Sequence, residues 1–189
     1  MSNKGLLVVI SGPSGVGKGT ICQELLKDPN VYLSVSATTR KPGKNETTGK
    51  SYLFISKDEF EKQIEQNGFL EYAGVFDNYY GTPREKVEQS LNDGKTVLLE
   101  IDVQGGTQVK KNMPQAVMIF ILPPDMQELE SRIRNRGRDS DETILKRLKK
   151  AQTEIDTAQE AYDYFVVNDS LEKAVNEVKT IIDNRRNSK

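Results

Sequence analysis

The stretch LLVVISGPSGVGKGTI, residues 6–21, constrains the fold of this chain more than any other part of its sequence. A continuous apolar run ends in a glycine-rich loop that fits G-x-x-x-x-G-K, and an amphipathic segment follows. In this pattern the glycines let backbone N–H groups converge on phosphate oxygens, and the lysine reaches the β- and γ-phosphates. The start of the following helix adds partial positive charge. We therefore expect a nucleotide-binding site at Gly12, Pro13, Ser14, Gly15, Val16, Gly17 and Lys18.

The residue after the lysine departs from the usual pattern. A serine or threonine normally stands there and gives its hydroxyl to Mg²⁺, whereas this chain has Gly19 followed by Thr20. Thr20 is expected either to reach the metal shell through water or to bond back within its helix. The sequence therefore predicts a nucleotide site at residues 12–20 but no direct metal ligand. Cys22, on the following helix, is interpreted as a packing residue.

Apolar runs alternate with helical patterns along most of the chain. Three runs are nearly continuous, as in parallel strands that are buried on both faces. The predicted strands are 6–11, 32–36, 52–55, 96–101, 117–122 and 165–167.

Helix signals lie between these runs. Ser56 and Thr82 each begin a capping-box pattern, and Pro124 begins a helix that should end near Gly137. Helical spacing also covers 143–161 and 171–184. Strands that alternate with helices predict an α/β fold, a three-layer core with a parallel sheet.

Composition excludes several classes of function. At 189 residues the chain is expected to form one domain or one core with small insertions. It has no histidine, which excludes Ser-His-Asp, Cys-His and histidine metal sites. Its net charge of −1 favours neither nucleic acid nor an anionic membrane as a partner. One cysteine and no long apolar segment indicate a cytoplasmic protein.

Positive charge is concentrated in ESRIRNRGRDSDETILKRLKK, residues 130–150. Arg132 and Arg136 are four residues apart and share a helix face, and Arg147 follows on the next predicted helix. A solvated basic face is the alternative interpretation. Because arginine forks match phosphate oxygens and a phosphate loop lies upstream, we favour a catalytic lid that brings arginines to a transferring phosphoryl group.

Two carboxylates end a predicted buried strand, in LLEIDVQG. Glu100 and Asp102 are two residues apart and point to the same face. Ligands bind at the carboxyl ends of strands in open α/β sheets. Asp102 is therefore a candidate contact for substrate or for a water molecule around Mg²⁺.

The segment from about 34 to 83 lacks long apolar runs and is predicted to be a small mixed insertion. Its polar residues suit a nucleoside monophosphate. Arg40 with Tyr52 or Tyr80 could hold the phosphate. Guanine presents N–H donors at N1 and N2, so a carboxylate such as Glu71 could recognise it, whereas adenine has no N1–H. Tyrosines packed on an edge strand are the alternative interpretation.

At these residues the chain resembles the guanylate kinase family, over residues 5 to about 175. The matching stretches include SGPSGVGKGT, SVSATTRKPG, GKSYLFIS, FLEYAGVFDNYYGTP, LLEIDVQGG, FILPPDMQELESRIRNRG and YFVVND. The resemblance implies transfer of the γ-phosphoryl group of ATP to GMP, with Mg²⁺. It also implies three parts: a core (1–36, 90–131 and 151–189), a GMP-binding insertion (37–89) and a lid (132–150).

The resemblance also implies a role for each matching residue. Lys18, with Arg132, Arg136 and Arg147, would meet the transferring phosphates, and Asn168 would lie near the adenine of ATP. Guanine recognition would fall to Ser36, Glu71, Thr82 and Asp102. The GMP phosphate would be held by Arg40, Tyr52 and Tyr80.

One departure from the family affects the phosphate site. Where the family often has a second phosphate-binding arginine, this chain has Gly43, with Lys44 beside it. A lysine supplies a point charge without the bidentate geometry of arginine. Whether Lys44 replaces that arginine is left open, as is the choice between monomer and homodimer.

Two other functions are weighed. The first is a GTPase, because DVQG, residues 102–105, matches the GTPase pattern D-x-x-G. The N-K-x-D motif that should follow in a GTPase is absent from the sequence. Guanylate kinase-like domains also serve as protein-binding scaffolds in which the phosphate loop has decayed. Here the loop with Lys18 and the arginines of the predicted lid are intact, which favours the enzyme.

Overall fold

The fold is built on a parallel sheet of five strands, in the order β2-β7-β1-β8-β9. The computed structural model describes residues 5–135, 137 and 139–188. The strands are β1 (Leu6–Ser11), β2 (Val31–Leu33), β7 (Thr96–Glu100), β8 (Val117–Leu122) and β9 (Tyr164–Val167). The α/β fold with a parallel sheet that the sequence predicted is confirmed.

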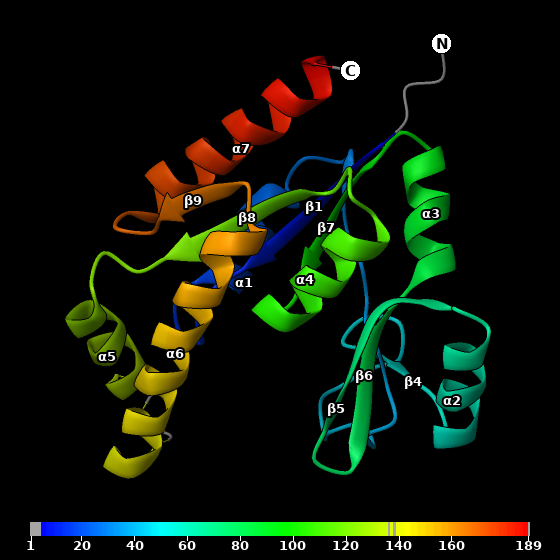
Figure 1. Cartoon of the computed structure of the whole chain (residues 1–189), viewed down its shortest axis with the longest axis horizontal. Coiled ribbons are helices and arrows are strands. Elements are labelled where there is room, and N and C mark those ends of the chain that lie inside the picture. Colours follow the sequence, from blue (N-terminus) through cyan, green and yellow to red (C-terminus); the bar gives the residue numbers. More distant parts are fainter. Residues whose placement is uncertain (1–4, 136, 138, 189) are drawn as a thin grey trace.

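Helices cover both faces of this sheet (Figure 1). Along β1, Leu6, Val8 and Ile10 belong to one buried cluster, and Leu7 and Val9 belong to the other. The first cluster includes residues of α1 (Lys18–Leu25), α5 (Met126–Arg134) and α7 (Leu171–Asn187). The second includes residues of α3 (Arg84–Asn92) and α4 (Val103–Asn112), and α6 (Asp141–Ala161) contributes to both. Side chains that alternate between two covered faces explain the continuous apolar runs.

A second sheet of four strands lies beside the core, in the order β4-β3-β6-β5. Its strands are β3 (Ala37–Thr38), β4 (Leu53–Phe54), β5 (Phe69–Val75) and β6 (Asn78–Pro83), and α2 (Lys57–Glu65) packs on it. Phe60 of α2 stacks on Phe69 and Tyr79, with ring centroids 4.2 and 5.2 Å away. This small aromatic core holds the second sheet together without the long apolar runs that a doubly covered sheet requires.

The differences from the sequence prediction concentrate in the second sheet. The predicted strand 32–36 ends at Leu33 in the core sheet, and a separate strand of the second sheet begins at Ala37. The hairpin of β5 and β6 was not predicted, because only the first residues of β5 and the last residues of β6 are buried and its apolar pattern is weak. The helix α4 was not predicted either, since its two glycines and polar residues weaken the helical pattern.

Helix starts were predicted with mixed success. Ser56 caps α2 as expected, and its hydroxyl accepts from the Glu59 N–H. The capping box at Thr82 is wrong, because Pro83 is the N-cap of α3 and the Thr82 hydroxyl donates to Glu71 instead. The helix expected at Pro124 begins at Met126, with Asp125 as its cap. In the described part of the chain, no helix is both long and apolar enough to cross a membrane.

Candidate active site

The loop predicted to bind phosphate, residues 12–17, connects β1 to α1 at the carboxyl edge of the core sheet. Gly17 has a φ of 102°, a left-handed conformation that glycine adopts without strain. A Cβ atom there would lie 2.5 Å from Asn168 Nδ2, so the backbone and this side chain are in close contact. The loop can take its shape only with glycine at this position.

The buried Asn168, which follows β9, supports the loop from behind. Its side-chain amide donates to the Val16 carbonyl at 2.8 Å. Arg132 of α5 donates to the backbone carbonyl of Asn168 at 3.1 Å and pairs with Glu128 at 2.8 Å. Arg132, a predicted lid arginine, is thus connected to the loop through Asn168, which was predicted for the ATP site.

Lys18 lies at the start of α1, with its side chain turned toward the loop. Its Nζ donates to the carbonyls of Gly12 at 2.5 Å and Pro13 at 3.2 Å. Burial lowers the pKa of the Lys18 ammonium, and the nearby carboxylates Glu100, Glu154 and Asp102 oppose that shift. The charge is held in a partly desolvated position, where it acts strongly on an anion.

Gly19 lies beside the carboxylate of Glu100. A Cβ atom on Gly19 would be 3.5 Å from Glu100 Oε1 and 3.7 Å from Oε2, which is ordinary contact distance. Glu100 therefore puts two oxygens next to the position from which a hydroxyl usually projects. Among the described residues, no group of three or more Cys, Asp or Glu side chains could hold a metal ion unaided.

The predicted lid meets the loop through α6. Arg147 donates to the Ser14 hydroxyl at 3.3 Å and pairs with Asp139 at 3.3 Å. Its guanidinium thus lies at the edge of the loop. Arg136, the other predicted lid arginine, lies outside the described residues.

Cys22 and Thr20 occupy different environments on α1. Cys22 is buried, and desolvation raises the pKa of its thiol to about 12, so it stays protonated. The interpretation of Cys22 as a packing residue is confirmed. Thr20 is exposed.

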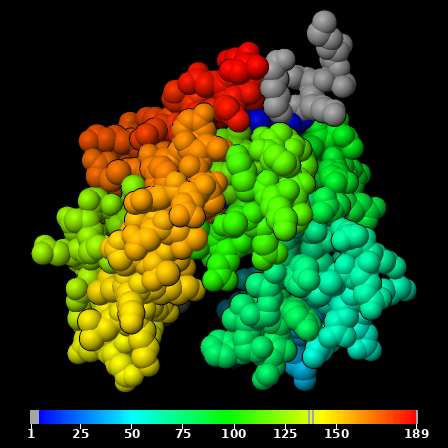
Figure 2. All heavy atoms as spheres, viewed as in Figure 1, coloured from blue at the N-terminus to red at the C-terminus, as the bar shows by residue number. Residues whose placement is uncertain are grey.

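A cavity of about 450 Å³ lies between the core sheet and the second sheet. Figure 2 shows the surface hollowed between α6 and the second sheet. Five predicted GMP-site residues line the cavity together with Glu100: Ser36, Tyr52, Glu71, Tyr80 and Asp102. The structure thus gathers residues that are up to 66 positions apart in the chain, from 36 to 102, around one space next to the loop.

Glu71 is the buried charge of this cavity, with 7% of its surface exposed. The buried Thr82, which does not line the cavity itself, donates its hydroxyl to Glu71 Oε1 at 2.6 Å. Burial raises the pKa of Glu71, the bond from Thr82 lowers it, and the charge of Asp102 raises it. Asp102 also caps α4, since its Oδ1 accepts from the Gly105 N–H at 2.9 Å. Sequence reasoning did not foresee that capping role.

Arg40 lies next to two tyrosines that line the cavity, Tyr52 and Tyr80. Its guanidinium is 5.4 Å from the Tyr52 ring centroid, and the neighbouring Glu46 and Tyr80 raise the pKa of Arg40. It also pairs with Glu46 at 2.8 Å. Lys44, the possible replacement for the missing arginine, is exposed.

Glu154 of α6 is a site residue that the sequence analysis missed. It is 9% exposed, pairs with Lys150 at 3.5 Å, and its charge acts on Lys18 and Asp102. Its spacing in the sequence could have indicated burial, because Glu154 lies on the same buried face of α6 as Ile144, Ala151 and Ala158. A glutamate in such a stripe marks a helix face that meets a charged partner.

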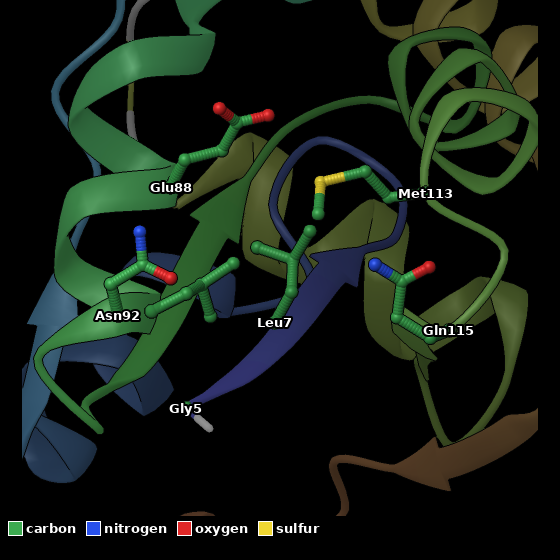
Figure 3. A pocket seen from close by; sticks show the side chains of 7 residues that line it. Gly5, Leu7, Glu88, Asn92, Met113 and Gln115 are labelled. Carbon is green, nitrogen blue, oxygen red and sulfur yellow. The ribbon is translucent and has the colours of Figure 1, made fainter. Parts of the chain in front are cut away.

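Another hollow, of about 250 Å³, lies at the other end of β1 (Figure 3). Its lining includes Gly5 and Leu7 from the start of the strand, Glu88 and Asn92 from α3, and Met113. Among the residues that the structure describes there, none that lines this hollow is a lysine or an arginine. The cationic loop and the tyrosine-lined cavity together make the better site for a phosphorylated ligand.

The comparisons with known proteins agree with this geometry. The family model described as Guanylate kinase matches residues 4–185. The guanylate kinase of Clostridium acetobutylicum is 52% identical over 96% of this chain and 87% of its own length. That of Clostridium tetani is 54% identical over 95% of this chain and 86% of its own length. The crystal structure of guanylate kinase from Anaplasma phagocytophilum superposes with a TM-score of 0.76, at 36% identity over 97% of this chain and 87% of that one.

Proposed function

The chain belongs to the guanylate kinase family, and we propose that its site transfers the γ-phosphoryl group of ATP to GMP, giving ADP and GDP. It is an enzyme, a nucleoside monophosphate kinase. The observation that carries the choice of GMP is Glu71, a buried carboxylate in a tyrosine-lined cavity beside a phosphate-binding loop. Its oxygens suit the N1–H and N2–H donors of guanine, which adenine does not offer together.

The ATP half of the site is built on the loop. Backbone N–H groups from Gly12 to Thr20 would surround the phosphates, and the Lys18 ammonium would move from the loop carbonyls to the β- and γ-phosphates. Asn168 would act on the loop that carries the nucleotide, since its side chain is bonded to Val16. Arg132, Arg136 and Arg147 would offset the charge that develops on the transferring group.

The GMP half combines the cavity with Arg40. Ser36, Glu71, Thr82 and Asp102 would recognise the base, and Thr82 would act through its bond to Glu71. Arg40, Tyr52 and Tyr80 would hold the GMP phosphate with their N–H and O–H donors. In this arrangement the base of GMP would lie toward Glu71 and its phosphate toward Arg40.

The residues beside Gly19 fit a magnesium ion. Mg²⁺ is usually bound by one or two carboxylates, by waters and by nucleotide phosphates, and Glu100 places both oxygens next to Gly19. Glu100 would hold the ion, with Asp102 and Thr20 acting through water. The ion supplies charge neutralisation on the β- and γ-phosphates.

The chemistry needs positioning more than proton transfer, because the acceptor phosphate is already an anion.

We propose a division into a core (1–36, 90–131 and 151–189), an insertion (37–89) that carries GMP and a lid (132–150). Lid and insertion would close over the two nucleotides and exclude water. We propose a cytoplasmic location for this activity.

A coupled assay of ADP release tests the proposal, with GMP, AMP, UMP and CMP as acceptors at constant ATP and Mg²⁺. Turnover with GMP well above the other three is the expected result. Turnover with AMP alone would overturn the role of Glu71. No turnover with any acceptor, in a protein that still binds GMP, would favour a scaffold.

A further inference from the structure

Tyr162 brings a hydroxyl into an apolar part of the core. It is the C-cap of α6, is buried, and belongs to the hydrophobic cluster on one face of the core sheet. Its ring packs edge-to-face on Phe120 of β8, with the ring centroids 5.3 Å apart. A phenylalanine would fill nearly the same space, and a buried hydroxyl costs free energy unless it is hydrogen bonded. Packing alone therefore does not require a tyrosine at this position.

The hydroxyl of Tyr162 begins a chain of two hydrogen bonds. It donates to the Ser11 hydroxyl at 2.6 Å, and both residues are buried. The Ser11 hydroxyl in turn donates to the backbone carbonyl of Asp102 at 3.3 Å. Each hydroxyl has one proton to donate, so the two bonds run in one direction, from Tyr162 through Ser11 to Asp102. The chain connects parts of the sequence that are 151 and 91 positions apart.

Gly106 of α4 makes room for this hydroxyl. A Cβ atom at Gly106 would lie 1.9 Å from the Tyr162 hydroxyl oxygen, so a larger residue would displace the ring or the helix. Burial raises the pKa of Tyr162, and the bond with Ser11 opposes that shift. The hydroxyl therefore stays protonated at neutral pH and remains a donor. Elements α4, α6 and β1 are thus fitted around one hydrogen bond.

Ser11 and Asp102 lie where two neighbouring strands separate. Strands β1 and β7 are paired in parallel up to Ile10 and Glu100. Beyond these residues β1 continues into the loop that is predicted to bind phosphate, and β7 continues into the start of α4. The Ser11 hydroxyl bonds the Asp102 carbonyl just past the last backbone pair. A side chain thus extends the connection between the two strands beyond the end of their ladder.

The two separating segments lead to the two halves of the proposed site. Ser11 directly precedes Gly12, whose carbonyl accepts a hydrogen bond from the Lys18 ammonium. Asp102 lines the cavity proposed for GMP, and its carboxylate caps α4 through the Gly105 N–H at 2.9 Å. The bond from Ser11 to Asp102 therefore links the loop proposed for ATP directly to the cavity proposed for GMP.

We propose that Tyr162 is a positioning residue for phosphoryl transfer. By directing the Ser11 hydroxyl toward Asp102, it holds the start of the phosphate loop against the start of α4. It thereby fixes the donor phosphates relative to the acceptor nucleotide. The inference rests on the proposed function and goes beyond it, because Tyr162 acts from the core, through Ser11. Alignment of the two reactants is a large part of what a phosphoryl-transfer site contributes to the rate.

The test compares Tyr162→Phe with Tyr164→Phe, a control at a half-buried tyrosine of β9. Tyr162→Phe removes only the hydroxyl and keeps the ring that packs on Phe120. We expect kcat to fall about tenfold, because small misplacements of reacting groups are costly. The KM for ATP and the KM for GMP should stay within twofold of wild type. Tyr164→Phe should leave all three values unchanged.

A double-mutant cycle with Ser11→Ala separates positioning from stability. Ser11→Ala leaves the buried Tyr162 hydroxyl without its acceptor and should lower the free energy of unfolding in urea. The double variant removes both partners and should regain stability. Its kcat should nevertheless stay as low as that of Ser11→Ala, because Tyr162 acts through Ser11. In Tyr162→Phe, amide hydrogen exchange should become faster at residues 12–17 and 103–106, and Tyr164→Phe should exchange as wild type does.

Several outcomes would overturn the inference. An unchanged kcat in Tyr162→Phe would mean that its hydroxyl has no part in alignment. A kcat that recovers together with stability in the double variant would mean that the chain of bonds only maintains the fold. A raised KM with an unchanged kcat would mean that it shapes one binding site. A wild-type protein that phosphorylates no GMP would instead refute the proposed function. Hydrogen exchange needs no turnover, so unchanged exchange at both segments would still show that Tyr162 does not hold the loop against α4.

Discussion

Replacing Thr82 by valine tests the base-recognising end of the cavity. The two side chains have nearly the same shape, so the change removes a hydrogen-bond donor without opening a cavity. That donor is the hydroxyl 2.6 Å from Glu71 Oε1, and both residues are buried, at 1% and 7% exposed. The variant therefore leaves a buried carboxylate with one partner fewer.

The expected magnitude follows from this bond. A hydrogen bond to a charged group contributes about 1.5–3 kcal/mol. Since about 1.4 kcal/mol corresponds to a tenfold change in binding, full transmission to the ligand would weaken GMP binding roughly 10- to 100-fold. Part of the loss will be recovered when the carboxylate turns, so we expect Thr82→Val to raise the KM for GMP about tenfold. The KM for ATP should not change.

The pH dependence gives a second readout with a definite sign. In the proposed site Glu71 would bind the guanine donors as a carboxylate, so GMP binding should be lost as pH falls through its pKa. Burial raises that pKa above the usual value, and the bond from Thr82 lowers it. Removing the bond raises the pKa further. The acid limb of kcat/KM for GMP should therefore move to higher pH in Thr82→Val.

The assay is coupled ADP release at a series of GMP concentrations and pH values. Thr180→Val, at an exposed position of α7, is the matched control. A KM for GMP within twofold of wild type, with an unmoved acid limb, would refute the reasoning. It would show that Glu71 does not need Thr82 to face the base.

Three further predictions concern the loop and the core beneath it. Lys18→Ala should lower kcat about 100- to 1,000-fold with an unchanged circular dichroism spectrum, and a loss below tenfold would contradict its role at the phosphates. Asn168→Ala removes the 2.8 Å bond to Val16 and should raise the KM for ATP severalfold more than the KM for GMP; equal effects on both would argue against a role in shaping the loop. Gly106→Ala puts a methyl group 1.9 Å from the Tyr162 hydroxyl, which donates to Ser11 at 2.6 Å. We expect a loss of about 2–4 kcal/mol in the free energy of unfolding, measured with urea, and an unchanged midpoint would mean that the helix α4 shifts freely.

The core was more predictable than the second sheet for a physical reason. Strands β1, β7 and β8 are covered on both faces, so Leu6–Ile10, Val97–Leu99 and Val117–Leu122 are continuously apolar and the pattern is plain in the sequence. The hairpin of β5 and β6 is buried only near its base, and part of its stability comes from aromatic stacking with Phe60. Such a strand carries little periodic signal, because its partners are distant in the chain.

The site shows the same division. The motif at residues 12–18 identified the loop directly, because a local backbone shape requires glycines at fixed spacing. Sequence could not assign Thr82 to Glu71, since helix capping and a cross-strand hydrogen bond both use a hydroxyl just before a helix. It likewise missed Glu154, whose buried position depends on how α6 lies across the core.

The sequence by itself determined the phosphate loop, the parallel α/β core and, through matching stretches along most of the chain, the family. These are properties of local spacing and of continuous apolar runs. Only the tertiary structure decided that Glu46 holds Arg40, that Asn168 supports the loop, and that Glu100 faces Gly19. Each of these depends on a side chain reaching a partner on another turn, strand or loop. The direction in which a side chain points is set by packing, which no single stretch of sequence contains.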